Sequence, residues 1–150
     1  MSERNFLDGL RLMDRQVRGA VALGMDQSAK QCLDKAINGD PAIPHKEGIL
    51  QGSGGAYVGG QIVARGNGPQ EHAAPEESGL RVQGDMIVGE VAFNSPYAAY
   101  QHEGHRQDGS RPVRHYSEEG VGPKFLEIAM KQHAEGYFAI IADEVRKVLG

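Results

Sequence analysis

A long amphipathic pattern at the amino-terminal end constrains the fold of this chain more than any other feature. From Ser2 to Asn38, apolar residues recur every three or four positions with charged and amide side chains between them, which is the spacing of one face of a helix. Ser2 is a suitable N-cap, and Asn38-Gly39-Asp40-Pro41 is a strong stop signal. The sequence therefore predicts a long helix within residues 1–40. Its apolar positions are Phe6, Leu10, Met13, Val17, Val21, Met25, Ala29, Cys32 and Ala36.

The length of this helix is itself informative. About 36 helical residues span about 54 Å at 1.5 Å per residue, whereas a compact domain of 150 residues is only roughly 40 Å across. Either the helix bends near Gly19 or Gly24, or one end projects beyond the rest of the domain. A projecting apolar stripe needs a neighbouring subunit to cover it, so we expect an oligomer.

Composition narrows the class of protein. A chain of 150 residues fits one domain with a substantial core. The net charge of −4 and the pI near 5.8 do not provide the concentrated basic surface that sequence-specific DNA binding requires, although passive contact with DNA is compatible with them. The single cysteine, Cys32, falls within the helical apolar pattern, and we expect a buried small hydrophobe there instead of a reactive thiol.

Neither a membrane span nor a signal peptide is indicated. The longest apolar run, Tyr137 to Ala142, is far too short to cross a bilayer, and the amino terminus is charged where a signal peptide would be apolar. We therefore expect a protein that is synthesised in the cytoplasm and has no membrane partner.

The middle of the chain, residues 48–94, is rich in glycine and predicts β-hairpins. Ile49-Leu50, Ala56–Val58 and Ile62–Ala64 are short strand candidates, with a tight turn at Gly59-Gly60. A second hairpin is expected from Leu80–Val82 and Met86–Phe93. Between the hairpins, the polar and Pro/Gly-rich residues 65–79 predict a long mobile loop.

The last third of the chain predicts a short helix, a loop and a long helix. Ser95 can cap a short helix over residues 95–104, with Gly104 ending it, and a loop follows over residues 105–122. Residues 123–150 carry a helical apolar stripe with Pro123 at the first position. The fold class predicted for the single domain 1–150 is α+β, with long N-terminal and C-terminal helices packed on a small antiparallel sheet of hairpins.

The cluster His102-Glu103-Gly104-His105 is the most chemical stretch of the chain. A zinc-protease motif needs two histidines four apart on one helical face, but here they are three apart and Gly104 ends the helix between them. A third ligand would have to come from Asp108 or His115, and no second pair has metal-ligand spacing. The residues favour surface contact over metal binding. A small metal-binding domain or metal-dependent enzyme is the alternative, and the leading expectation is a non-enzyme without cofactors.

Three short motifs follow one another along the chain. They are Gly48-Ile49-Leu50 with Ser53, then Asn94-Ser95-Pro96-Tyr97-Ala98 with Tyr100, Glu103 and Gly104, then Gly122-Pro123-Lys124-Phe125-Leu126 with Ala129. In this order and spacing they resemble the minor capsid and head–tail joining proteins of tailed bacteriophages. The chain departs from that pattern at Lys124, inserted between Pro and Phe, and in the His-rich residues 101–105.

The resemblance implies a structural virion protein of the phage neck. Such a protein is made in the host cytoplasm and forms a homo-oligomeric ring that joins the portal side of the head to the tail, around the DNA channel. Its partners would be a portal-side adaptor or stopper and tail terminator or tail-tube proteins. A tail terminator or a non-viral adaptor is the further alternative.

Two sets of residues are expected to carry this role. The structural anchors are Pro96, Tyr97, Tyr100, Gly104, Pro123, Phe125 and Leu126. The candidate interface residues, mostly in the two loops, are Arg65, Glu71, His72, Glu76, Glu77, His105, Arg106, Arg111 and Arg114.

Overall fold

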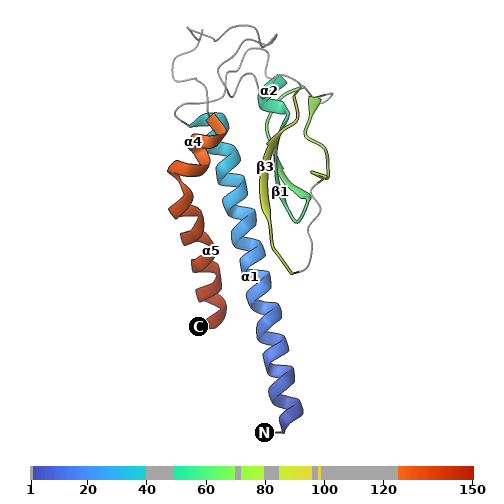
Figure 1. The fold of residues 1–150 in the computed structure, drawn as a ribbon, viewed down its shortest axis with the longest axis vertical. Coiled ribbons are helices and arrows are strands. Elements are labelled where there is room, and N and C mark those ends of the chain that lie inside the picture. The colour runs from blue at the N-terminus through green and yellow to red at the C-terminus, as the bar shows by residue number, and fades with distance from the viewer. Residues whose placement is uncertain (1, 40–48, 70–71, 80–84, 96–97, 99–124) are drawn as a thin grey trace.

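The computed structural model describes residues 2–39, 49–69, 72–79, 85–95, 98 and 125–150. Its elements run in the order α1 (Glu3–Asn38), α2 (Ile49–Gly52), β1 (Gly54–Val58), β2 (Gln61–Arg65), β3 (Gly89–Phe93), α4 (Phe125–Gln132) and α5 (Ala134–Leu149). Figure 1 shows α1 lying between α5 on one side and the sheet on the other, with its amino-terminal end running on past both. The predicted α+β class is confirmed.

Helix α1 is continuous from Glu3 to Asn38. The Ser2 hydroxyl accepts a hydrogen bond from the Asn5 N–H at 3.3 Å, as an N-cap does. At the other end, the Gly39 N–H donates to the Lys35 carbonyl at 2.8 Å. The glycines at positions 19 and 24 do not interrupt the helix, so of the two arrangements expected from its length, the projecting helix is the one observed.

The sheet has three antiparallel strands in the order β2-β1-β3. Strands β1 and β2 form the predicted hairpin, and both turn residues, Gly59 and Gly60, adopt positive φ angles of 61° and 82°. Strand β3 pairs with β1, with Val91 opposite Ala56. The partner expected from the sequence, residues 80–82, lies outside the described residues, and the strand itself begins at Gly89 instead of Met86.

The predicted strand at Ile49-Leu50 is wrong, because these residues form the one-turn helix α2. The Ser53 hydroxyl donates to the Leu50 carbonyl at 2.7 Å, and the Ser53 N–H donates to the Ile49 carbonyl at 3.0 Å. These bonds hold the chain in a helical turn. Short apolar runs fit a strand and a buried helical turn equally well, so the residues alone did not separate the two.

Residues 72–79 lie against the outer face of the sheet instead of standing away from it as a mobile loop. The Tyr57 hydroxyl donates to the Pro75 carbonyl at 2.9 Å, and the Arg65 Nε–H donates to the Ala74 carbonyl at 3.0 Å. The side chain of Ala74 is buried. The Ile62 N–H also donates to the Glu76 carbonyl at 3.0 Å, which ties this segment to the edge of β2.

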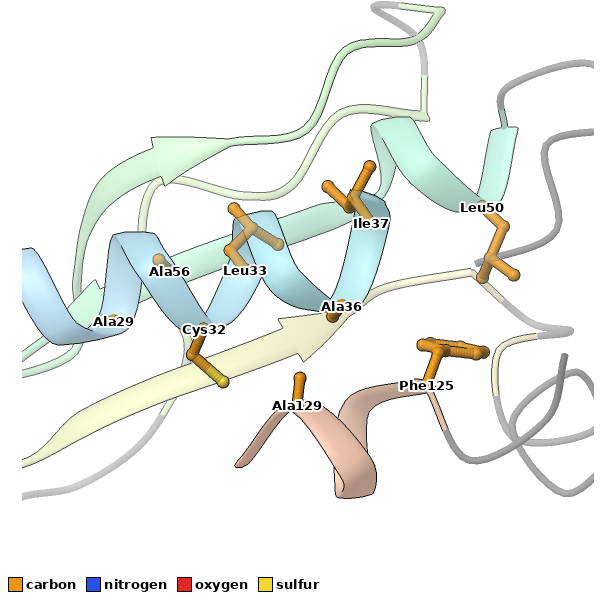
Figure 2. Close-up of a cluster of buried hydrophobic side chains, with 9 residues drawn as sticks. All are labelled: Ala29, Cys32, Leu33, Ala36, Ile37, Leu50, Ala56, Phe125 and Ala129. Atoms are coloured by element: carbon orange, nitrogen blue, oxygen red, sulfur yellow. The ribbon is translucent and has the colours of Figure 1, made fainter. Parts of the chain in front are cut away.

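The hydrophobic core lies where the carboxyl-terminal half of α1 meets the sheet and α4 (Figure 2). The Phe125 ring at the start of α4 packs edge-on against the ring of Phe93 in β3, with centroids 5.5 Å apart. The buried members of this cluster are Ala29, Cys32, Leu33, Ala36, Ile37, Leu50, Ala56, Phe125 and Ala129.

The single helix predicted over residues 123–150 is wrong in one respect, because the described part consists of α4 and α5 separated at His133. Helix α4 buries Phe125 and Ala129 in the core, while α5 runs along α1. The Tyr137 hydroxyl donates to the Ala129 carbonyl at 3.0 Å across the break. Both helices pack on α1, α4 in the core beside its carboxyl-terminal end and α5 along Gly24 and Ser28, and a continuous apolar period does not reveal this division.

Candidate interaction surface on the projecting half of helix α1

The contact between α1 and α5 is close and antiparallel. A Cβ atom placed on Gly24 would lie 2.6 Å from the Cα of Ile141, so only glycine fits at this point. One turn further along α1, the Ser28 hydroxyl donates to the Tyr137 carbonyl at 3.1 Å. Four residues along one helix thus match four residues back along the other. Continuing this register places Val17 opposite Val148, next to the end of α5 at Leu149.

The face of α1 that meets α5 continues toward the amino terminus with apolar side chains. At about 100° per residue, Phe6, Leu10, Met13 and Val17 fall on the same side of the helix as Ala20, Gly24 and Ser28. Ala20, Gly24 and Ser28 are buried. By contrast, the exposed fractions of Phe6, Leu10 and Met13 are 56%, 47% and 51%. We call Phe6, Leu10 and Met13 the projecting stripe.

The rest of the projecting half carries charged side chains together with the exposed Leu7 and Leu12. Arg18 pairs with Asp14 at 3.2 Å and with Asp85 at 3.6 Å, and Arg11 pairs with Asp8 at 3.5 Å. These side chains are well exposed, so each pair adds little to stability. They keep the charged positions in water. Among the exposed apolar residues, the projecting stripe is the set that continues the face of α1 covered by α5.

Two titratable groups, Cys32 of α1 and Tyr137 of α5, meet where the two helices pack, and neither has the character of a reactive site. Burial raises the pKa of the Cys32 thiol, which is also in hydrogen-bond contact with the Tyr137 side chain. Burial, with Cys32 as a further cause, strongly raises the pKa of the Tyr137 hydroxyl. Both groups are therefore held in their neutral forms, which suits packing and not nucleophilic chemistry.

The expected structural anchors are only partly described. Phe125 is 1% exposed and lies in the core, and Leu126 is partly buried against it. The other anchors, Pro96, Tyr97, Tyr100, Gly104 and Pro123, lie outside the described residues.

The expected interface residues fall into two groups. Arg65, Glu76, Glu77 and His72 are exposed on or beside the segment that crosses the outer face of the sheet. Arg65 pairs with Glu76 at 2.6 Å, and Gln61 in β2 donates to Glu77 at 3.4 Å. The others, Glu71, His105, Arg106, Arg111 and Arg114, lie outside the described residues.

Exposed apolar side chains gather on α1, away from the loops where the sequence places its named interface residues. The i, i+4, i+7 spacing of Phe6, Leu10 and Met13 shows in the sequence that they share one face of a helix. That this face is uncovered follows only from the structure, in which α5 ends at Leu149. Exposed Met130 and Phe138 on α4 and α5 are further apolar side chains that the sequence does not single out as surface residues.

The alternative metal ligands His102, His105, Asp108 and His115 all lie outside the described residues. In the part of the chain that the structure describes, no three histidine, cysteine, aspartate or glutamate side chains gather as a metal site would require. The helices of that part also include none that combines the length and apolar character needed to cross a bilayer.

Comparison with known proteins found no matching family model, no similar curated protein and no similar solved structure.

Proposed function

We propose that this chain is a structural, non-enzymatic subunit of the neck of a tailed bacteriophage, located where the head joins the tail. The observation that carries the proposal is the projecting half of α1, whose apolar side has no cover within the described residues. A subunit with such a surface is built to be covered by a neighbour. This property is expected of a component of a larger assembly.

The packing around the quoted motifs is compatible with this role. Ile49, Leu50 and Ser53 form the buried turn at α2, and Phe125 opens α4 in the core. These residues stabilise the fold of the subunit, and the resemblance to head–tail joining proteins implies the same structural role for them. The proposal therefore assigns them to architecture and assigns the exposed surfaces to partners.

In this role the subunit forms a homo-oligomeric ring in the virion neck. The ring contacts a portal-side adaptor or stopper on one side and tail terminator or tail-tube proteins on the other. A net charge of −4 suits a ring around a DNA channel, because basic walls would hold the phosphates of a passing duplex.

The experiment is disruption of the gene in the phage that carries it, followed by electron microscopy of the lysate. We expect full heads and separate tails that do not join, with joining restored by the wild-type gene in trans. Cryo-electron microscopy of the wild-type neck should then show density for this chain between portal and tail. Infectious, joined particles from the disrupted phage, or a virion without this chain, would overturn the proposal.

A further inference from the structure

The space beside the projecting stripe is the continuation of the position that α5 occupies along α1. Helix α5 lies against Gly24 and Ser28 and ends at Leu149, close to Val17. Beyond that point the same face of α1 continues for the fourteen residues from Glu3 to Gln16, about 21 Å of helix. Figure 1 shows this length of α1 standing alone below the end of α5. We call this space the open position.

We infer that the open position is filled by α1 of a second copy of this chain, in an antiparallel, two-fold symmetric pair. The occupant must be helical, because the stripe continues a helix–helix contact with the same spacing. It must also stop where α5 ends. An antiparallel second α1 meets both conditions. It is a helix, and its own projecting half, residues 3–16, is not covered by its own α5.

A parallel pair is excluded by the fold itself. If the second α1 ran parallel to the first with the stripes facing, its carboxyl-terminal half would have to occupy the volume that α5 already fills beside Gly24 and Ser28. In an antiparallel pair, each α1 would likewise meet the partner's α5 if the two helices overlapped beyond their projecting halves. Only the projecting halves can therefore overlap, and each covers the other completely because they have equal length.

The antiparallel register follows from this limit. When the amino terminus of the partner's α1 stops at the end of α5, near Val17, the partner's Met13 lies opposite Phe6 and the partner's Phe6 lies opposite Met13. Leu10 then lies next to its own copy at the two-fold axis. All three residues of the projecting stripe are therefore covered, and each by an apolar side chain.

Gly9 and the helix ends are consistent with this pairing. Gly9 borders the stripe and has open space around it, with nothing within 4 Å of an added Cβ; a glycine there allows the partner's Leu10 to approach closely, as Gly24 allows Ile141. The positive end of the partner's α1, with Glu3 in its first turn, meets the negative end of α5, where Arg146 and Lys147 are exposed. The helix dipoles are complementary, and Arg146 and Lys147 already pair with Asp143 and Glu144 of the same helix.

The contact is small, so the pair should be weak. Three half-exposed side chains from each copy bury less than the roughly 1,200 Å² of a standard interface, so we expect a dissociation constant that falls within the concentrations tested below. A two-fold contact closes at two copies. The pair supplies the neighbour that the stripe requires, and a neck ring would join such pairs through other surfaces.

Sedimentation equilibrium of the purified chain across about 1–300 µM tests the pairing. We expect the mass to rise from 16.2 kDa toward about 32 kDa. Leu10→Glu places two carboxylates at the two-fold axis and should raise the dissociation constant at least tenfold. The matched control is Leu12→Glu: Leu12 is 50% exposed on the same helix but lies roughly 160° around it from Leu10, so its dissociation constant should stay at the wild-type value. A wild-type chain that is monomeric at 300 µM, or equal effects of the two changes, would overturn the inference.

Cysteine cross-linking tests the direction. Under mild oxidation, a mixture of Phe6→Cys and Met13→Cys chains should form a disulfide-linked pair, whereas Phe6→Cys alone should not. Wild type, whose Cys32 is buried, is the control. Efficient linking of Phe6→Cys to itself would instead indicate a parallel contact and overturn the inference. The wild-type chain could instead be monomeric in solution and sediment with anionic phospholipid vesicles. If Leu10→Glu abolishes that binding and Leu12→Glu does not, the stripe binds a membrane surface and the inference is overturned. Neither result depends on the phage experiment.

Discussion

The two halves of α1 share one sequence pattern but have opposite surroundings. From Ala20 to Ile37 most apolar residues on the packed face are enclosed between the sheet and α5, with Leu23 an exposed exception, while from Phe6 to Met13 residues of the same spacing are about half exposed. The periodicity does not change at the boundary. What changes is the neighbour, because α5 ends there. An apolar period thus tells which side of a helix will be covered, but not which molecule covers it.

The difference also separates two sources of helix stability. The packed half is held by burial, whereas the projecting half relies on the Ser2 cap, on exposed pairs such as Asp14–Arg18, and on extending a helix that is already nucleated. Substitutions in the two halves should therefore have different effects on stability.

The largest expected difference comes from the same change in the two halves. Leu33→Ala removes a side chain that is 3% exposed in the core and should lower the free energy of unfolding by about 2–5 kcal/mol. Leu12→Ala, at 50% exposure, should change it by no more than about 0.5 kcal/mol. Urea denaturation followed by circular dichroism measures both. Similar losses would mean that the projecting half is not bare in solution.

The glycines of α1 should respond with opposite signs. Gly24→Ala places a methyl group 2.6 Å from the Ile141 Cα and 3.0 Å from its Cγ1, which forces α5 away and should cost about 1–3 kcal/mol. Gly19→Ala meets nothing within 4 Å and should stabilise the helix by up to about 1 kcal/mol. Thermal denaturation of the two variants gives the comparison. Destabilisation by Gly19→Ala would show that something covers that side of α1.

The Tyr137 hydroxyl makes the seam between α1 and α5 sensitive to alkali. Its pKa is raised in the fold, so its contribution to stability is complete below the unfolded-state pKa of about 10 and is lost as the pH rises above that value. Tyr137→Phe gives up the hydrogen bond to the Ala129 carbonyl, at a cost of about 1 kcal/mol near neutral pH. Between pH 9 and 11 its unfolding free energy should fall less steeply than that of wild type. Parallel slopes would contradict the burial of this hydroxyl.

The smallest effect is expected at Arg18, where the two halves meet. Its pairs with Asp14 and Asp85 are exposed, so Arg18→Ala should cost at most about 1 kcal/mol. Urea titrations at 0.05 M and 1 M salt should differ for wild type and agree for the variant. A loss that persists at high salt would be assigned to the hydrogen bond that the Arg18 Nη1–H donates to the Asp85 carbonyl at 3.2 Å, not to the ion pairs.

Local signals in the sequence predict the parts of this fold that local chemistry controls. The α1 boundaries follow from Ser2 and from the stop after Asn38, and the β1–β2 hairpin follows from Gly59 and Gly60. The apolar pattern does not contain the break at His133, nor the helical turn at Ile49, which is closed by hydrogen bonds from Ser53 to the Ile49 and Leu50 carbonyls. The same limit applies to the candidate surface. The spacing of the stripe is visible in the sequence, whereas its exposure depends on where a distant helix ends.

The continuity of α1 has a mechanical consequence. The carboxyl-terminal half is clamped between α5 and the sheet, and the amino-terminal half extends from this clamp as an unbroken rod of about 21 Å. A rotation of the clamp by only 10° would swing the tip by roughly 4 Å, about the width of one strand spacing. Small rotations at the Gly24–Ile141 contact would therefore produce larger displacements at the amino-terminal tip of α1. A partner bound to that tip would be moved with it.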